Sequence, residues 1–215
     1  MKIISIQLIH LNKAYIFGLL YSDGCNYPKQ NLIRLSLQEK DRDILEKVKK
    51  EIGSNFPLRR VERTKYSPNW QPLYELEFHN QHLSEQLEKM GMVNNKSYFA
   101  EFPTCVPDEF LRDFVRGYVD GNGSIGFYDY PRYVNVTSTL KFCATLSFII
   151  KEKLEISVRI YGKKTCDAKM LAINKSKDIL KFLNWIYDGS ELHLCRKYEA
   201  YLEIKEYMTK KTLSD

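Results

Sequence analysis

The sequence predicts an α+β protein of two similar halves, each with the element order α-β-β-α-β-β-α. One observation is a glycine-containing segment that occurs twice, 99 residues apart. A second is that each copy is followed by short alternating apolar and polar segments, typical of strands, between segments with helical periodicity. A repeat this long indicates a duplicated domain rather than a solenoid. We expect an N-terminal half at residues 1–97, a linker at 98–110 and a C-terminal half at 111–215.

The repeated segment is interpreted as a helix that stops at a glycine. Residues 15–26 are YIFGLLYSDGCN and residues 114–125 are FVRGYVDGNGSI, so that Gly18 aligns with Gly117. Either copy alone would fit a turn, since Asp-Gly and Asn-Gly pairs favour turns. Two aligned copies, each closing an apolar helical segment and each followed by a strand pattern, favour the helix.

The elements after the first copy follow from periodicity. Ile33, Leu35 and Leu37 alternate with polar residues, which is typical of a half-buried strand. Apolar residues then recur at helical spacing as far as Gly53, a residue type that commonly ends a helix. The first half is expected to hold a strand at 31–37, a helix at 41–52, strands at 58–65 and 73–78, and a helix at 83–90.

The second half repeats these signals in the same order. It is expected to hold a strand at 133–138, a helix at 140–154, strands at 157–161 and 170–173, and helices at 179–187 and 196–208. The proline-containing segment before the second copy supports a linker there.

Composition is consistent with a globular protein that binds a polyanion. Lysine and arginine number 33 against 27 acidic residues, a net charge of +6, although many proteins without such a partner carry this surplus. No apolar run is long enough for a membrane helix, and the N-terminus does not read as a secretory signal. The five cysteines lack metal-ligand spacing. We therefore expect a cytoplasmic or organellar protein that is not secreted and does not enter a membrane.

Small residues on the two motif helices predict that the helices pack against each other. Gly18 and Ser22 are four residues apart and share a helix face, as do Gly117 and Gly121. Small residues at this spacing let two helix backbones approach closely. The helix interface expected from these four residues is a pseudo-twofold contact that brings the two helix ends together.

The residues at those ends, Asp23 and Asn122, are the expected metal ligands. A carboxylate at a helix C-terminus is unfavourable beside the helix dipole, and a divalent cation would remove that conflict. Mg²⁺ prefers carboxylate, carbonyl, water and phosphate oxygens, so the carbonyls of Ser22 and Gly121 are expected to contribute. Two such sites close together are suited to phosphodiester hydrolysis.

With these features, the sequence resembles the LAGLIDADG homing endonucleases. The motif copies are residues 16–24 and 115–123, and the likeness extends to the run of residues 116–121 and to Arg196-Lys197 at the last predicted helix. The resemblance implies a single-chain, intron-encoded enzyme whose saddle-shaped antiparallel sheets lie in the major groove of double-stranded DNA. It implies a monomer with a long asymmetric target site and Mg²⁺, for which Mn²⁺ or Ca²⁺ would substitute in binding. The eighth motif position, the metal ligand of the family, falls at Asp23 and Asn122.

Asn122 departs from the family pattern, which has an acidic residue there. An amide oxygen can coordinate a hard cation but brings no charge. Asp120 is two positions earlier, about 200° around the helix, and therefore points elsewhere. The sequence predicts cleavage that is weakened or confined to one strand.

The remaining site residues are expected on the sheets. Gln38 and Ser138 would orient water, and Lys175, which aligns opposite His79, would stabilise charge on the phosphate. The expected DNA-binding residues are Arg34, Ser36, Gln38, Arg59, Arg63, Lys65, Arg132, Lys141, Lys163, Lys164 and Lys169. Each of these also fits an ordinary solvated surface residue.

Two other functions fit the same fold. One is a DNA-binding protein that retains the site but does not cut, and the other is a maturase that binds intron RNA on the same saddle. The residue at position 122 and the genomic neighbourhood separate them from the endonuclease.

Overall fold

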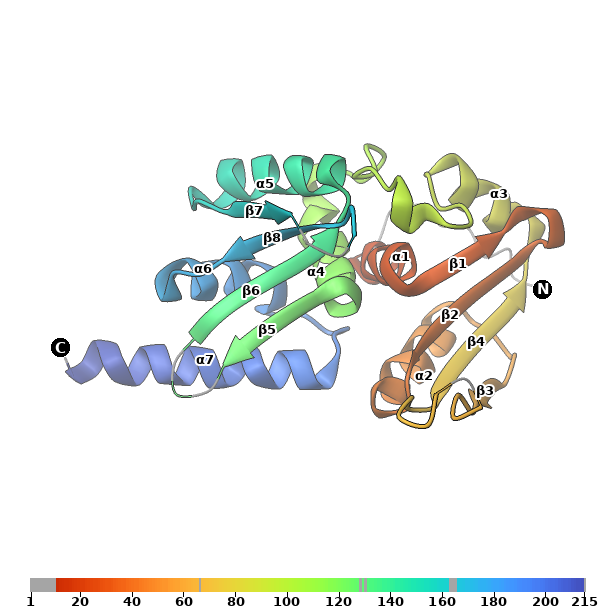
Figure 1. Cartoon of the computed structure of the whole chain (residues 1–215), viewed down its shortest axis with the longest axis horizontal. Coiled ribbons are helices and arrows are strands. Elements are labelled where there is room, and N and C mark those ends of the chain that lie inside the picture. Colours follow the sequence, from red (N-terminus) through yellow and green to blue (C-terminus); the bar gives the residue numbers. More distant parts are fainter. Residues whose placement is uncertain (1–10, 66, 128, 130, 163–165, 215) are drawn as a thin grey trace.

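Two helices of the repeated motif lie side by side at the centre of the chain, with one antiparallel sheet on each side (Figure 1). The computed structural model describes residues 11–65, 67–127, 129, 131–162 and 166–214. The first half consists of α1 (Leu11–Asp23), β1 (Gly24–Tyr27), β2 (Leu32–Gln38), α2 (Arg42–Glu51), β3 (Leu58–Val61), β4 (Leu73–His79) and α3 (Gln81–Lys89). The second half consists of α4 (Leu111–Asn122), β5 (Gly123–Phe127), β6 (Pro131–Ser138), α5 (Leu140–Leu154), β7 (Arg159–Gly162), β8 (Lys169–Ile173), α6 (Ser176–Tyr187) and α7 (Cys195–Ser214).

The two sheets have equivalent topology, which confirms the predicted duplication. Sheet 1 has the order β1-β2-β4-β3 and sheet 2 the order β5-β6-β8-β7, with every strand pair antiparallel. Each motif helix runs directly into the first, outer strand of its own sheet. The end of each helix is therefore fixed relative to the sheet that follows it.

In the part of the chain that the structure describes, helices cover only one face of each sheet. In β2, the side chains of Ile33, Leu35 and Leu37 are buried against the helices, whereas Arg34 and Ser36 on the opposite face are partly exposed. This alternation confirms the prediction for residues 31–37 and leaves an uncovered face. We call the uncovered faces the open face of sheet 1 and the open face of sheet 2.

Several element boundaries differ from the prediction for local reasons. The strand predicted at 58–65 ends at Val61, which pairs with Leu73. The next pair would place Glu62 opposite Pro72, which has no N–H to donate. The last helix continues past the predicted end at residue 208 to Ser214, since no glycine or proline interrupts it. Gly53 follows α2 with a φ of 64°, as expected for a helix end.

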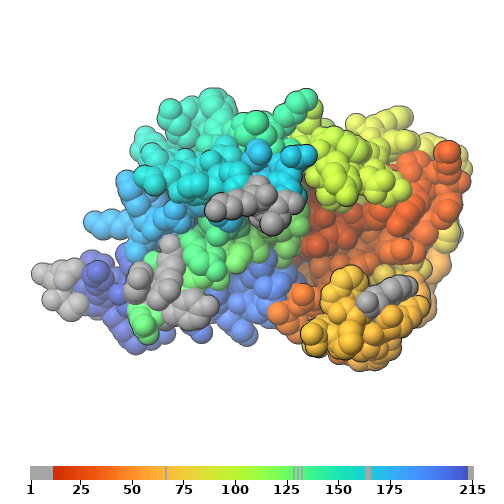
Figure 2. All heavy atoms as spheres, viewed as in Figure 1, coloured from red at the N-terminus to blue at the C-terminus, as the bar shows by residue number. Residues whose placement is uncertain are grey.

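Short 3₁₀ turns at Lys96–Tyr98 and Asp108–Phe110 connect the halves between α3 and α4. A second contact lies at the start of α7, where Arg196 holds the buried carboxylate of Asp41 with bonds of 2.9 and 3.1 Å. Figure 2 shows the blue start of α7 against the orange part of the N-terminal half. The halves are thus joined at the helix pair and again beside it. Among the described helices, none has the length and apolar character needed to cross a bilayer.

Candidate active site between two helix ends

The motif helices touch backbone to backbone. A Cβ atom at Gly18 would lie 2.1 Å from the carbonyl oxygen of Phe114, and one at Gly117 would lie 2.0 Å from that of Tyr15. No side chain larger than hydrogen fits at either position. The reciprocal contact shows that the pseudo-twofold axis passes between these two glycines.

One turn further on, the carboxylate of Asp23 crosses to the other helix. A Cβ atom at Gly121 would lie 2.2 Å from Asp23 Oδ2 and 1.9 Å from Ser22 Oγ. The Ser22 hydroxyl donates to the Leu19 carbonyl at 2.9 Å and lies 3.3 Å from Asp23 Oδ2. The small residue on α4 thus makes room for the acidic end of α1.

Asp23 is a carboxylate drawn out of water. Its burial raises the pKa above the usual aspartate range, opposed by the positive charge of Lys197 and the nearby Ser22 hydroxyl. A desolvated carboxylate of this kind is stabilised by an added cation. Asp23 is therefore suited to hold a metal ion.

Asn122 occupies the matching position but presents an amide. Its Nδ2 donates to the Tyr118 hydroxyl at 3.2 Å, and that hydroxyl donates to Ser138 Oγ at 2.8 Å. Burial raises the pKa of Tyr118 to about 12, so the phenol stays protonated. The exposed amide of Asn122 therefore has its oxygen available for a ligand. The Ser138 hydroxyl, expected to orient water, is instead buried under Tyr118.

Asp120 does not reach the helix ends. It is fully buried and accepts hydrogen bonds from the Tyr15 hydroxyl, the Tyr187 hydroxyl and the Leu194 amide at 2.8, 2.6 and 2.8 Å. Burial raises its pKa. Asp120 joins α4 to α1, α6 and the start of α7, and it is no substitute for the missing acidic ligand.

Lys197 belongs to the family likeness seen in the sequence, but no role was predicted for this lysine, which closes the end of α4. Lys197 is buried, and its Nζ donates to the carbonyls of Val119, Asp120 and Gly123 at 2.7, 2.5 and 2.8 Å. A cation at a helix C-terminus is stabilised by the helix dipole. Burial nevertheless lowers the pKa of Lys197 to about 8, and Asp23 is among the acidic groups that oppose this shift.

Lys96 is the counterpart of Lys197 in the first half. It is buried and donates to the carbonyl of Gly24, and burial lowers its pKa. Lys96 follows Asp23 by 73 residues and Lys197 follows Asn122 by 75. This near-equal spacing is the signal by which the pair could have been found from the sequence.

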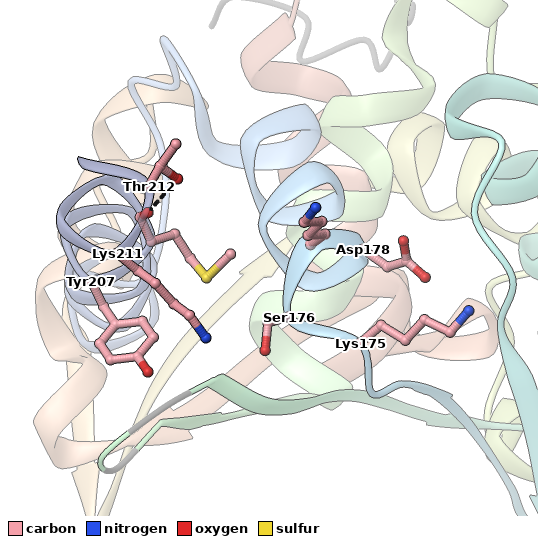
Figure 3. Close-up of a pocket in the computed structure, with 8 residues that line it drawn as sticks. Lys175, Ser176, Asp178, Tyr207, Lys211 and Thr212 are labelled. Carbon is pink, nitrogen blue, oxygen red and sulfur yellow. Dashed lines mark hydrogen bonds between the residues drawn. The ribbon is translucent and has the colours of Figure 1, made fainter. Parts of the chain in front are cut away.

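Lys175 was predicted to stabilise charge on the phosphate, and the strand register places it away from the end of α4. Gly123, at the end of α4, pairs with Val136, which pairs with Leu171. Lys175 lies four residues beyond Leu171, roughly 13 Å further at the rise of a strand. It lines a separate pocket between α6 and α7 (Figure 3), together with Ser176, Lys177, Asp178, Tyr207, Met208, Lys211 and Thr212.

The donor set at the helix ends fits a hard divalent cation only in part. Within the described residues, no three His, Cys, Asp or Glu side chains gather into a metal site. The oxygens available are the carboxylate of Asp23, the amide oxygen of Asn122 and the last-turn carbonyls of Ser22 and Gly121. Such a site would need water or phosphate oxygens to complete its coordination.

The open face of sheet 1 carries part of the predicted DNA-binding set. Arg34, Ser36, Gln38 and Arg59 lie on it in β2 and β3. Arg63 and Lys65 do not extend this row, because β3 ends at Val61 and the guanidinium of Arg63 lies 4.1 Å from the Trp70 ring centre in the loop. Sequence reasoning also missed two acidic residues on this face, Glu75 and Glu77, which pair with the basic residues.

Two of the residues predicted to bind DNA in the second half, Lys141 and Lys169, do not lie on the open face of sheet 2. Lys141 lies on α5, in the helix layer, and pairs with Glu101. Lys169 pairs in register with buried Ser138, on the helix side of the sheet. The side chain of Arg132 and all of Lys163 and Lys164 lie outside the described residues. The open face instead holds Ser124, Asn135, Thr137, Arg159 and Tyr161.

Several solved structures of other proteins share the fold of this chain. No protein-family model matches the sequence, and no curated protein matches it. The I-LtrWI LAGLIDADG homing endonuclease bound to target DNA is similar, with a TM-score of 0.63, 14% identity, and 94% of this chain and 91% of that chain covered. The homing endonuclease I-WcaI bound to its DNA recognition sequence is also similar, with a TM-score of 0.68, 14% identity, and 87% of this chain and 85% of that chain covered. Full-length DUF199/WhiA from Thermatoga maritima has a TM-score of 0.60 and 17% identity over 98% of this chain and 64% of its own. The chain has the fold of the single-chain LAGLIDADG homing endonucleases.

Proposed function

We propose that the protein is a site-specific endonuclease of double-stranded DNA that uses divalent metal ions, with Mg²⁺ as the expected ion. The observation that carries the proposal is the joined pair of helix ends. The Asp23 carboxylate lies against Gly121, the residue before Asn122, and the buried Lys96 and Lys197 bond to the carbonyls that follow each helix. That similarly folded homing endonucleases are bound to DNA supports it.

Each part of the chain has a distinct task in this proposal. The two open faces bind successive half-sites, so one chain serves as a monomer on an asymmetric target. Asp23 and the amide oxygen of Asn122 would hold the metal ions, which supply positive charge where negative charge develops on the phosphate. Lys197, whose Nζ donates to three backbone carbonyls, would hold the end of α4 in place and keep a positive charge beside Asp23.

The two helix ends are chemically unequal, and this shapes the expected activity. Asp23 contributes a negative charge and Asn122 contributes none. The metal site nearer Asn122 should therefore fill only at high metal concentration. We expect slow cleavage of both strands or preferential nicking of one.

A DNA-binding protein that does not cut is the second candidate. The neutral Asn122 favours it, because an amide in place of a carboxylate weakens the metal site that cleavage would need. In that case the open faces would keep their function and the helix ends would serve only as a joint.

The test begins with selection of bound sequences from a randomised double-stranded DNA pool. The enriched site is then incubated with protein in Mg²⁺, in Mn²⁺ and in EDTA, beside the variant Asp23→Asn. We expect metal-dependent breaks with the unmodified protein, and no breaks but retained binding with Asp23→Asn. Enrichment without any break in either metal would favour the DNA-binding candidate. Preferential competition by structured RNA over the selected DNA would favour a maturase.

A further inference from the structure

The open face of sheet 1 is a network of paired charges. Arg34 pairs with Glu77, and Arg59 contacts Glu75 at 2.5 Å and Glu77 at 3.4 Å. Ser36 Oγ donates to Glu75 Oε1 at 3.1 Å. Each arginine on this face therefore lies beside a carboxylate.

The two carboxylates differ in how far a ligand can reach them. The side chain of Glu75 is 10% exposed, and both of its oxygens accept hydrogen bonds from Ser36 and Arg59. The side chains of Glu77 and Arg34 are 30% and 32% exposed. Both bonds to Glu77 use Oε1, so its Oε2 is the oxygen that can accept from a ligand. Glu75 therefore holds the network in place, and Glu77 and Arg34 are the members that a ligand can reach.

The open face of sheet 2 has a contrasting chemistry. Its four strands contain no aspartate or glutamate. One row across the strands runs Ser124, Asn135, Ala172 and Arg159, and the next runs Thr137, Met170 and Tyr161. The side-chain oxygen of Asn135 is buried and accepts no hydrogen bond from the described residues. An unpaired acceptor of this kind is stabilised by a ligand that donates to it.

The two surfaces match different base edges in the major groove of DNA. Arginine donates to O6 and N7 of guanine and glutamate accepts from N4 of cytosine, so an Arg–Glu pair matches G·C pairs. Asparagine pairs with N6 and N7 of adenine, and threonine and small apolar side chains contact the thymine methyl group. A carboxylate facing DNA is unfavourable near phosphate unless a base amino group donates to it.

We propose that the two half-sites differ in composition: sheet 1 reads a half-site rich in G·C pairs, and sheet 2 reads one richer in A·T pairs, with Arg159 on its edge strand β7 as the described residue that would contact a guanine. This inference rests on the proposed function, since it names the substrate of the same DNA-binding surface. The competing explanation is that the Arg–Glu pairs only stabilise sheet 1, with Glu77 making no contact to a base.

The experiment is selection from a randomised duplex pool with the full chain and three variants. Glu77→Gln removes the charge of the carboxylate that a ligand can reach on sheet 1, and Asn135→Ala removes the amide on the open face of sheet 2. Glu46→Gln is the matched control, because Glu46 pairs with Arg42 on α2, away from both open faces. We expect one G·C-rich and one A·T-rich half-site. Glu77→Gln should lower the preference for G·C by about tenfold at a position in the first half-site only, and Asn135→Ala should relax the second only. Glu46→Gln should leave both unchanged.

The possible results distinguish failure of this inference from failure of the proposed function. An enriched and cleaved site with equal G·C content in both halves overturns the inference and leaves the endonuclease intact. Unaltered preference in Glu77→Gln, with a melting curve like that of the unmodified chain, overturns the role of Glu77. Failure to enrich any duplex overturns the proposed function as well.

Discussion

Lys197 is the residue whose burial has the most direct consequence for the pH dependence of the protein's stability. Its Nζ lies among three carbonyl oxygens at the end of α4. Burial lowers its pKa from 10.5 to about 8. Below that pH the folded protein carries the full cost of a buried ammonium, and the cost diminishes as the pH rises from about 8 towards 10.5. Lys197 therefore makes the folded protein more stable as the pH rises through this range.

We predict that the free energy of unfolding rises with pH between about 8 and 10.5 in the unmodified protein, because the folded chain loses this buried charge before the unfolded chain does. Lys197→Arg keeps the charge but cannot lose it at these pH values. This variant should therefore lack the rise in stability. The measurement is urea unfolding at several pH values, with Lys205→Arg on the exposed side of α7 as control. Equal pH dependence in Lys197→Arg and in the unmodified chain would show that Lys197 does not lose its proton in this range.

At the scale of the elements, the pair α1 and α4 determines where everything else lies. The backbones meet at Gly18 and Gly117, where any Cβ atom would overlap a carbonyl oxygen. Rigid backbone atoms cannot move aside as a flexible side chain can. Separation of the two helices would also part Asp23 from Gly121.

Gly117→Ala should accordingly destabilise the chain by about 3 kcal/mol or more, a large value for one methyl group. Gly162→Ala is the matched control, because the nearest atom to its added methyl group would be Lys169 Nζ at 3.9 Å. Urea unfolding of both variants measures the difference. Equal midpoints for the two variants would contradict the close helix contact.

Element-level patterns were predictable from the sequence where they depend on local periodicity. The duplicated helices, the alternation in β2 and the extent of α5 at Leu140–Leu154 all follow from residues close in sequence. The end of β3 at Val61 was not predictable in this way, because it depends on Pro72 in the partner strand. A pairing partner is a long-range feature that periodicity within one segment does not contain.

The candidate site was predictable at the helix ends and not around them. Asp23 and Asn122 stand at fixed positions of the repeat, so the sequence placed them. Lys96 and Lys197 bond to backbone carbonyls more than 70 residues away in the chain, and only their near-equal spacing after the two motif copies marks them in the sequence. Glu77 was likewise missed, because its role depends on its cross-strand partner Arg34.

At the scale of the whole molecule, both open faces belong to one chain. The helix pair and the bond between Asp41 and Arg196 fix the halves relative to each other. In the proposed function, each open face reads one half-site, so no second subunit is needed.

We therefore predict that one chain binds one duplex, with an affinity that falls steeply as salt rises because phosphate contacts release counterions. Sedimentation of the complex gives the stoichiometry, and titrations between 50 and about 200 mM salt give the slope. Two chains per duplex, or affinity that does not respond to salt, would contradict a monomeric saddle.

In the proposed function, an unequal pair of helix ends cuts DNA. Asp23 contributes a carboxylate ligand, and Asn122 contributes an uncharged amide, which binds a metal ion more weakly. Asn122→Asp supplies the missing charge without touching the open faces, so sequence preference should stay the same. Asp120 cannot serve in its place, since its oxygens are occupied in the core.

The most direct measurement follows a supercoiled plasmid carrying the selected site, with nicked and linear products resolved over time in Mg²⁺ and Mn²⁺. We expect the unmodified protein to accumulate nicked plasmid or to linearise it slowly, and Asn122→Asp to linearise it at least tenfold faster at the same site. Equal rates of linearisation by the two proteins would contradict the account, because the charge at position 122 would then have no part in cleavage.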